Sequence, residues 1–186
     1  MFDGIILDSN LMHSVPKEQR FFSGMDCYIH CVESLQGTMI NELAKANASK
    51  ALDLCESVFL GDGTDDMLAV ASYLGGVSIV NSEVGICHAL SYGLSLELGL
   101  RHGFANCIAF YLLEEYYGES VLKFKEMIEI HRVSLPKNLC HSLSDDSIER
   151  MIDMTLKMER PLNNALGENW KKIFTRKKIG SLYRSM

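Results

Sequence analysis

The feature that most constrains the fold is the stretch from Met67 to Leu96, in which Glu83 is the only charged residue. Its longest uncharged run before a break, Met67 to Val80, spans 14 residues. A membrane-spanning helix needs roughly 18 or more apolar residues in a row. We therefore predict no membrane partner and interpret this run as a buried internal helix, in which Gly75-Gly76 would let another backbone approach closely.

The rest of the chain carries helical patterns separated by short breaks. From Ile40 to Val58, apolar residues recur on one side of a helix and charged residues fall largely on the other, which is typical of a surface helix. Only three prolines occur in 186 residues, so long helices can run uninterrupted. The predicted helices run from Ser23 through Glu33 to Gly37, from Ile40 to Gly61, from a Thr64 or Asp65 cap to Asn81, from Phe104 to Glu115, from Ser120 to His131, from a Ser144 cap to Pro161, and from Trp170 to Leu182.

The opening of the chain differs from the rest. Gly4 to Leu11 predicts a short strand, and Ser14 to Pro16 indicates a connection, because the residue before a proline avoids the helical region. A lone strand has nothing to pair with in a helical chain. We therefore predict an all-α helical bundle over residues 23–186, preceded by a strand and linker over residues 1–22.

Charge and cysteine content narrow the class of function. The net charge of −6 argues against a general nucleic-acid-binding protein. From Trp170 onward the chain has six basic residues and no acid, which fits a solvated terminal helix or a contact with a partner or a phosphate. The first residues lack the basic start and long apolar run of a secretory signal. We therefore predict that the six cysteines are free thiols in a reducing cytoplasm.

Two pairs of side chains have a spacing suited to a metal site. Asp26 and His30 are four residues apart and would project from the same face of a helix. His88 and His102 flank an apolar run with several glycines, where an imidazole is costly unless a partner satisfies it. We predict that these four residues meet around one divalent metal ion, with separate structural roles as the alternative. Three imidazoles and one carboxylate suit Zn²⁺ or Fe²⁺ and do not choose between them.

The remaining histidines and the nearby cysteines have simpler interpretations. His13, His131 and His141 are predicted to be packed or solvated side chains. Cys27 and Cys31 are also four residues apart, a spacing that suits two metal ligands on a helix. Cys27 follows Asp26 and Cys31 follows His30, so each thiol points about 100° away from the predicted ligand before it. Core packing is therefore the predicted role of both thiols.

Three segments resemble signatures of a known enzyme family. Gly24 to Glu33 (GMDCYIHCVE) resembles the GMDxxxHxxE signature of iron-containing, group III alcohol dehydrogenases. Gly85 to Leu90 is similar to that family's GxxHAL segment, and His102 to Asn106 to its HGxxN segment. The segments occur in the family's order, and the resemblance covers essentially the entire chain. GMDCYIHCVESL and HALSYGLS are most similar to the sugar-acid branch that includes 3-deoxy-manno-octulosonate 8-oxidase.

This resemblance implies the fold of the C-terminal, metal-binding domain that iron alcohol dehydrogenases share with dehydroquinate synthase-like proteins. It also implies Asp26, His30, His88 and His102 as the ligands of Fe²⁺ or Zn²⁺. The implied reaction is the oxidation of a polyol or sugar-acid alcohol, or the reverse reduction of an aldehyde. In that chemistry the metal stabilises the alkoxide and a hydride passes to NAD(P).

Two positions depart from the family pattern. Many members have a second histidine four residues after the one that matches His88, often assigned to proton relay, whereas this chain has Tyr92. The tyrosine could relay a proton or bind substrate, and packing is the alternative. Before His102 the chain has Arg101 where a proline is common. This arginine could contact an anionic substrate such as a sugar carboxylate, or it could simply be solvated.

The resemblance is limited to the second half of a two-domain design. The chain has no glycine-rich strand–turn–helix fingerprint for a dinucleotide: Gly61 to Gly63 follows a predicted helix. We therefore expect a fragment, a truncated product or one half of a split enzyme, partnered by a nucleotide-binding half or by further copies of itself. The alternatives are a catalytically inactive helical module that binds a partner protein, and a dehydroquinate synthase-like lyase.

Overall fold

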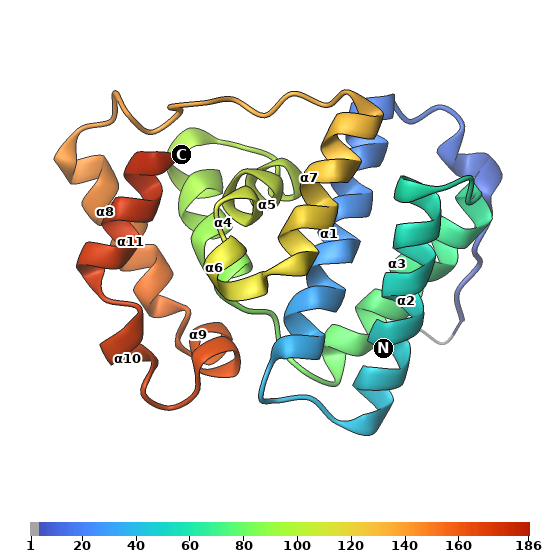
Figure 1. The fold of residues 1–186 in the computed structure, drawn as a ribbon, viewed down its shortest axis with the longest axis horizontal. Coiled ribbons are helices and arrows are strands. Elements are labelled where there is room, and N and C mark those ends of the chain that lie inside the picture. Colours follow the sequence, from blue (N-terminus) through green and yellow to red (C-terminus); the bar gives the residue numbers. More distant parts are fainter. Residues whose placement is uncertain (1–3) are drawn as a thin grey trace.

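The computed structural model describes residues 4–186, and within them the chain is helical with no strand, which confirms the all-α prediction (Figure 1). A 3₁₀ helix, η1 (Ser9–Met12), precedes the α-helices. The α-helices are α1 (Lys17–Gln36), α2 (Glu42–Leu60), α3 (Asp65–Val80), α4 (Ile86–Leu98), α5 (His102–Tyr111), α6 (Glu114–Tyr117), α7 (Glu119–His131), α8 (Asp145–Lys157), α9 (Glu159–Leu166), α10 (Trp170–Ile173) and α11 (Arg176–Ser185).

Helix α1 connects the two sides of the bundle. It packs against α2 and α3 on one side and against α5 on the other, while α4 lies between α5 and α8 (Figure 1). Its core-facing residues, among them Met25, Tyr28 and Ile29, are completely buried. Because α1 contacts both sides, side chains on its inner face can meet groups from α4 and α5.

Several helix boundaries were predicted from local capping chemistry. The side chains of Thr64 and Ser144 accept hydrogen bonds from backbone N–H groups three residues later, so both act as N-caps as predicted. Helix α2 also ends at Gly61 as predicted. By contrast, α1 begins at Lys17 rather than near Ser23, and the Pro16 carbonyl accepts the first hydrogen bond of the helix, from the Arg20 N–H.

The predicted strand over Gly4–Leu11 is wrong. Residues 4–8 form no strand, and residues 9–12 form η1, which the side chain of Asp8 caps by accepting a hydrogen bond from the Asn10 N–H. An isolated extended segment has no ladder partner in a helical chain, so local capping decides its conformation. Residues 1–3 of the predicted N-terminal segment lie outside the described residues.

Other predictions require correction as well. The helices predicted from Phe104 to Glu115 and from Trp170 to Leu182 are each divided in two, into α5 and α6 and into α10 and α11. Helix α3 is not internal, because Tyr73 and Val80 are exposed, the latter to 74%. The helix packs on α1 and α2 along one face only. On that face Gly75 does permit close approach, since a Cβ there would lie 3.0 Å from the Cys27 Sγ. Pro161 does not stop α8, which ends at Lys157; the proline lies in the first turn of α9, where it is tolerated.

All six cysteines are buried free thiols, as predicted. Cys27 and Cys31 point into the core near Gly75 and Cys55, which agrees with a packing role. In the part of the chain that the structure describes, no helix is long and apolar enough to cross a membrane.

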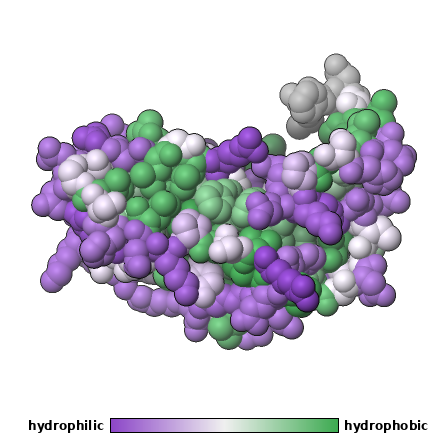
Figure 2. Space-filling view, turned by 90° about the horizontal axis from the view of Figure 1, so that it is seen from above, coloured by the Kyte–Doolittle hydropathy of each residue, from purple (hydrophilic) through white to green (hydrophobic). Residues whose placement is uncertain are grey.

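The face seen in Figure 2 carries the connection between α7 and α8, where apolar side chains gather among hydrophilic ones. A hollow of about 490 Å³ on this side is lined by α5, by α7, by residues 133–138 and by the C-terminal residue Met186. None of its lining residues belongs to the predicted metal site.

Candidate metal centre

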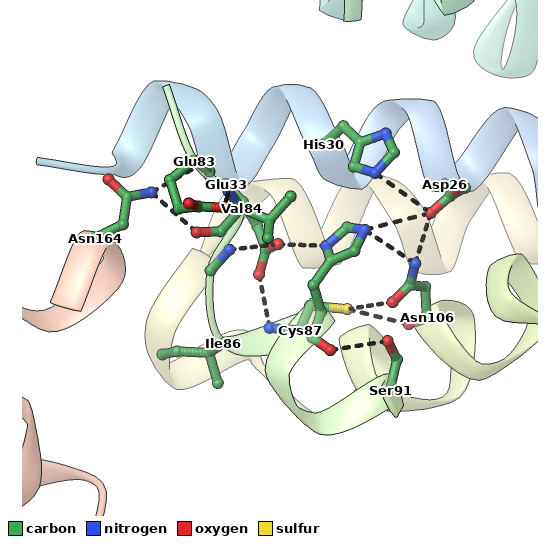
Figure 3. Close-up of polar contacts among 12 residues, drawn as sticks. Asp26, His30, Glu33, Glu83, Val84, Ile86, Cys87, Ser91, Asn106 and Asn164 are labelled. Carbon is green, nitrogen blue, oxygen red and sulfur yellow. Dashed lines mark hydrogen bonds and ion pairs between the residues drawn. The ribbon is translucent and has the colours of Figure 1, made fainter. Parts of the chain in front are cut away.

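The structure brings the four predicted ligands together at the junction of α1, α4 and α5. One potential ligand atom from each of Asp26, His30, His88 and His102 lies within 4.8 Å of the others. The Asp26 Oδ1 is 3.8 Å from the Nε2 of His30. It is 3.4 Å and 3.5 Å from the Nε2 atoms of His88 and His102. Figure 3 shows Asp26 and His30 pointing from α1 toward the same space.

The local backbone explains how three helices converge there. Asp26 and His30 are one helical turn apart on α1, whereas His88 lies in the first turn of α4 and His102 is the first residue of α5. The next residue, Gly103, allows α5 to start directly against α1, because a Cβ at this position would lie 2.6 Å from the Phe22 carbonyl oxygen. A larger side chain would separate the two helices.

The imidazole rings are packed and differ in exposure. The rings of His30 and His88 stack with centroids 4.5 Å apart, and those of His88 and His102 are 5.3 Å apart. The His88 side chain is buried, those of Asp26 and His30 are partly buried, and that of His102 is 41% exposed. The cluster is therefore closed on the His88 side and open on the His102 side.

The protonation states suit a cation. Burial opposes ionisation of Asp26, but the hydrogen bond from His88 and the charges of the three imidazoles outweigh it and lower its pKa to about 2. Burial and the neighbouring His88 lower the pKa of His30 to about 4, and burial also lowers the pKa of His102. Burial acts to lower the pKa of His88, but Glu33 and Asp26 outweigh it and raise it to about 9. A metal ion would thus meet one carboxylate and two neutral imidazoles, and would displace one proton from His88.

A side-chain amide points into the centre of the cluster. The Asn106 Nδ2 is 2.5 Å from the Asp26 Oδ1 and 3.1 Å from the Nε2 atoms of both His88 and His102. An amide nitrogen carries only two hydrogens, so it cannot donate to all three of these atoms. The atoms converge on one point, and three imidazoles with one carboxylate fit Zn²⁺ or Fe²⁺ once His88 has given up its Nε2 proton.

Tyr92 and Arg101 lie at the open side. The Tyr92 ring is 5.7 Å from the His102 ring and is 39% exposed. Arg101 immediately precedes α5, and its guanidinium donates a 2.9 Å hydrogen bond to the Gln19 side chain on the surface. Tyr92 can therefore contact a molecule that enters the cluster. Arg101 lies next to His102 at the solvent-exposed edge of the cluster.

The sequence interpretation missed two residues that contact the ligands. Glu33 bonds to His88, and Asn106 bonds to three of the four ligands. Both lie within the segments that resemble the family signatures. The available signal for Glu33 was a carboxylate in an apolar part of α1, three residues after His30. For Asn106 it was a polar residue four positions after His102.

The histidines outside the cluster lie where packing or solvation satisfies them. The His131 Nε2 is 3.0 Å from the Phe59 carbonyl oxygen, and its ring packs against Phe21 and Phe59. His13 and His141 are exposed. All three interpretations as ordinary packed or solvated side chains agree with the structure.

Comparison with known proteins identifies related sequences. Residues 21–167 match the model of the Fe-containing alcohol dehydrogenase family, C-terminal. The NADPH-dependent butanol dehydrogenase of Clostridium saccharobutylicum is 24% identical over 170 residues, which cover 88% of this chain and 41% of that protein. Alcohol dehydrogenase 4 of Schizosaccharomyces pombe is 30% identical over 108 residues, which cover 54% of this chain and 26% of that protein.

Solved structures show the same helical fold. An iron-containing alcohol dehydrogenase from Thermotoga maritima superposes with a TM-score of 0.74 at 23% identity, covering 95% of this chain and 51% of that one. An iron-containing alcohol dehydrogenase from Thermococcus thioreducens gives a TM-score of 0.73 at 21% identity, covering 96% and 53%. The chain thus spans about half the length of these proteins.

Proposed function

The chain belongs to the Fe-containing alcohol dehydrogenase family, and we propose that it supplies the metal centre of an enzyme that interconverts an alcohol and an aldehyde. The observation that carries the proposal is the convergence of Asp26, His30, His88 and His102, whose ligand atoms lie within 4.8 Å of one another. In this proposal the metal-binding domain, predicted over residues 23–186, also takes in the start of α1 from Lys17.

The proposed ion is Fe²⁺ or Zn²⁺, held by these four side chains. When bound, it would act as a Lewis acid on the alcohol oxygen. Asp26 supplies the negative charge, because its pKa of about 2 keeps it ionised. His30 supplies a neutral nitrogen, because its pKa is lowered to about 4. The buried His88 side excludes water, so the substrate would enter past the more exposed His102.

Residues at the open side would handle the substrate. The Tyr92 hydroxyl is available to hydrogen-bond an alcohol or to pass its proton to solvent, because the side chain is partly exposed beside His102. Arg101 would favour a substrate with a carboxylate, since a guanidinium binds such a group through two parallel hydrogen bonds. These features support a polyol or a sugar acid as the substrate class.

The hydride acceptor in this proposal is NAD(P), held by a nucleotide-binding half in the same or another polypeptide, or by an oligomer. The name of the related butanol dehydrogenase specifies NADPH. The buried free cysteines are consistent with a reducing compartment such as the cytoplasm.

Metal content tests the proposal. Purified chain loaded with Fe²⁺ or Zn²⁺ and then desalted should retain about one ion per chain, and Asp26→Ala and His88→Ala should each lose it. His131→Ala is the matched control, because His131 is a packed histidine outside the cluster. Equal metal in all four proteins would contradict the proposal.

A helical module that binds a partner without catalysis is a second candidate. The exposed apolar side chains of α3, Val70, Tyr73 and Val80, favour it because such residues are suited to a protein contact. Turnover of a panel of alcohols with NAD(P), by the metal-loaded chain together with a nucleotide-binding half, separates the candidates. Metal binding without turnover would favour the module.

A further inference from the structure

Glu33 is a buried carboxylate that accepts four hydrogen bonds. Its Oε2 accepts from the Gly85 N–H at 2.8 Å and from the His88 Nδ1 at 2.5 Å. Its Oε1 accepts from the Cys87 N–H at 2.6 Å and from the Tyr117 hydroxyl at 2.8 Å. The side chain has no solvent exposure, so water does not compete for these bonds.

The number of donors determines what can stand at this position. A carboxylate has two oxygens with about four acceptor sites and no donor when it is ionised. All four sites are occupied here, two of them by backbone N–H groups that begin α4. A neutral amide of the same shape would have one acceptor oxygen, and its NH₂ group would face two other donors. Only an acceptor-only group satisfies this environment.

The same bonds fix the direction of the His88 ring. Because Glu33 only accepts, the His88 Nδ1 must carry the hydrogen, and the Nε2 then faces Asp26 at 3.4 Å. We propose that Glu33 is a positioning residue, which holds His88 with its Nε2 free to bind the metal ion of the proposed function.

The surroundings make this arrangement rigid before any ion arrives. A Cβ at Gly85 would lie 2.7 Å from the Tyr117 hydroxyl oxygen and 3.0 Å from the Glu33 Oε1, so the backbone closes tightly around the carboxylate. The His88 ring is also held by His30, on which it stacks. A ligand that is already oriented loses less freedom when it binds the ion, which raises the affinity.

Glu33 also caps α4, so a test must separate metal binding from stability. Tyr117→Phe is the matched control: it removes one donor to Glu33 and the bond from the Ile86 N–H to the tyrosine oxygen, but leaves the His88 contact intact. Both Glu33→Gln and Tyr117→Phe should lower the melting temperature, because both disturb the start of α4.

Zn²⁺ affinity, measured by competition with a chelator, then distinguishes the two variants. Glu33→Gln should weaken Zn²⁺ binding by about 10- to 100-fold, as loss of a hydrogen bond to a metal-bound histidine does elsewhere. Tyr117→Phe should bind like the wild type. Equal affinity of Glu33→Gln and the wild type would overturn the role of Glu33 and leave the metal site standing. Failure of the wild type itself to bind Zn²⁺ would instead overturn the proposed function.

A second measurement needs no variant that must fold. In ¹⁵N-labelled wild-type chain loaded with Zn²⁺, the His88 ring should show a protonated Nδ1 whose hydrogen exchanges slowly with water, and a zinc-bound Nε2. A zinc-bound or unprotonated Nδ1 would overturn the inference, whatever the effect of the substitutions.

Discussion

The two sides of the candidate metal centre are built differently. On the inner side, Glu33 (Figure 3) is buried and accepts hydrogen bonds from the buried side chains of His88 and Tyr117. On the outer side, His102 and Tyr92 are 41% and 39% exposed. The difference indicates that the inner side is fixed by folding, whereas the outer side is open to solvent. Substitutions on the inner side should therefore change stability and metal affinity together. Substitutions on the outer side should change stability little, whatever their effect on metal affinity.

The largest expected effect is that of His88→Ala on the metal-free chain. It leaves the Glu33 carboxylate buried without its imidazole partner, and removing one member of a buried charge pair costs about 3–5 kcal/mol of unfolding free energy. His102→Ala should cost less than about 1 kcal/mol, because the side chain is partly exposed. Chemical denaturation in the presence of a chelator measures both. Equal losses would contradict the distinction between the sides.

The pH dependence of the metal-free chain should show the inner side directly. The folded pKa of His88 is raised to about 9, so its contribution is complete below the unfolded value near 6.5 and is lost as the pH rises through 9. The loss should be on the order of 3 kcal/mol. His30, with a folded pKa of about 4, is neutral throughout this range.

His88→Gln is the control for the pH experiment. Burial raises the pKa of the Cys87 and Cys107 thiols in the folded chain. As the pH rises, these thiols therefore lose their protons in the unfolded chain before they do so in the folded one, which also lowers stability near the top of this range. The difference between wild type and His88→Gln removes that contribution. Parallel stability profiles of the two proteins from pH 6.5 to 9.5 would contradict the prediction.

A smaller effect is expected where α5 meets α1. Gly103→Ala places a methyl group 2.6 Å from the Phe22 carbonyl oxygen, so α5 must move and carry His102 with it. Unfolding should become easier by about 1–3 kcal/mol, and metal affinity should fall. Gly76→Ala is the matched control, because a Cβ there meets no atom within 4 Å. It should raise stability by up to about 1 kcal/mol and leave metal affinity unchanged.

The smallest effect is predicted for Arg101→Ala on the outer side. Within residues 4–186 its side chain bonds only to Gln19 at the surface, so stability should change by less than about 0.5 kcal/mol and metal content should stay the same. Calorimetry with the Zn²⁺-loaded chain should show weaker binding of a hydroxy acid, with binding of the matching neutral alcohol unchanged. Equal weakening of both ligands would exclude a role for Arg101 in charge recognition.

Sequence reasoning found what depends on local chemistry. The Thr64 and Ser144 caps follow from side chains that bond to the backbone three residues away. The spacing of Asp26 and His30 placed both on one face of α1, and their meeting with the later histidines was predicted as well. In each case the physical cause lies within a few residues or in an evident need to satisfy a buried polar group.

The rest depends on partners that the local sequence does not name. The local pattern of Gly4–Leu11 predicted a strand, but a strand needs a neighbouring strand to pair with, and none is present in residues 4–186. Helix α3 was predicted to be internal from its apolar residues, but one of its faces is exposed. Sequence alone does not say whether a second layer of structure covers a helix. The role of Glu33 was missed because its donors come from residues more than 50 positions away.

The most direct measurement of the central claim is X-ray absorption at the metal edge of the chain loaded with one equivalent of Zn²⁺. The account predicts three imidazole nitrogens and at least one oxygen, at about 2.0–2.2 Å from the ion. Asp26→Ala should remove the signal of this ordered site. A shell of water oxygens without imidazole scattering would show that these four side chains do not hold the ion.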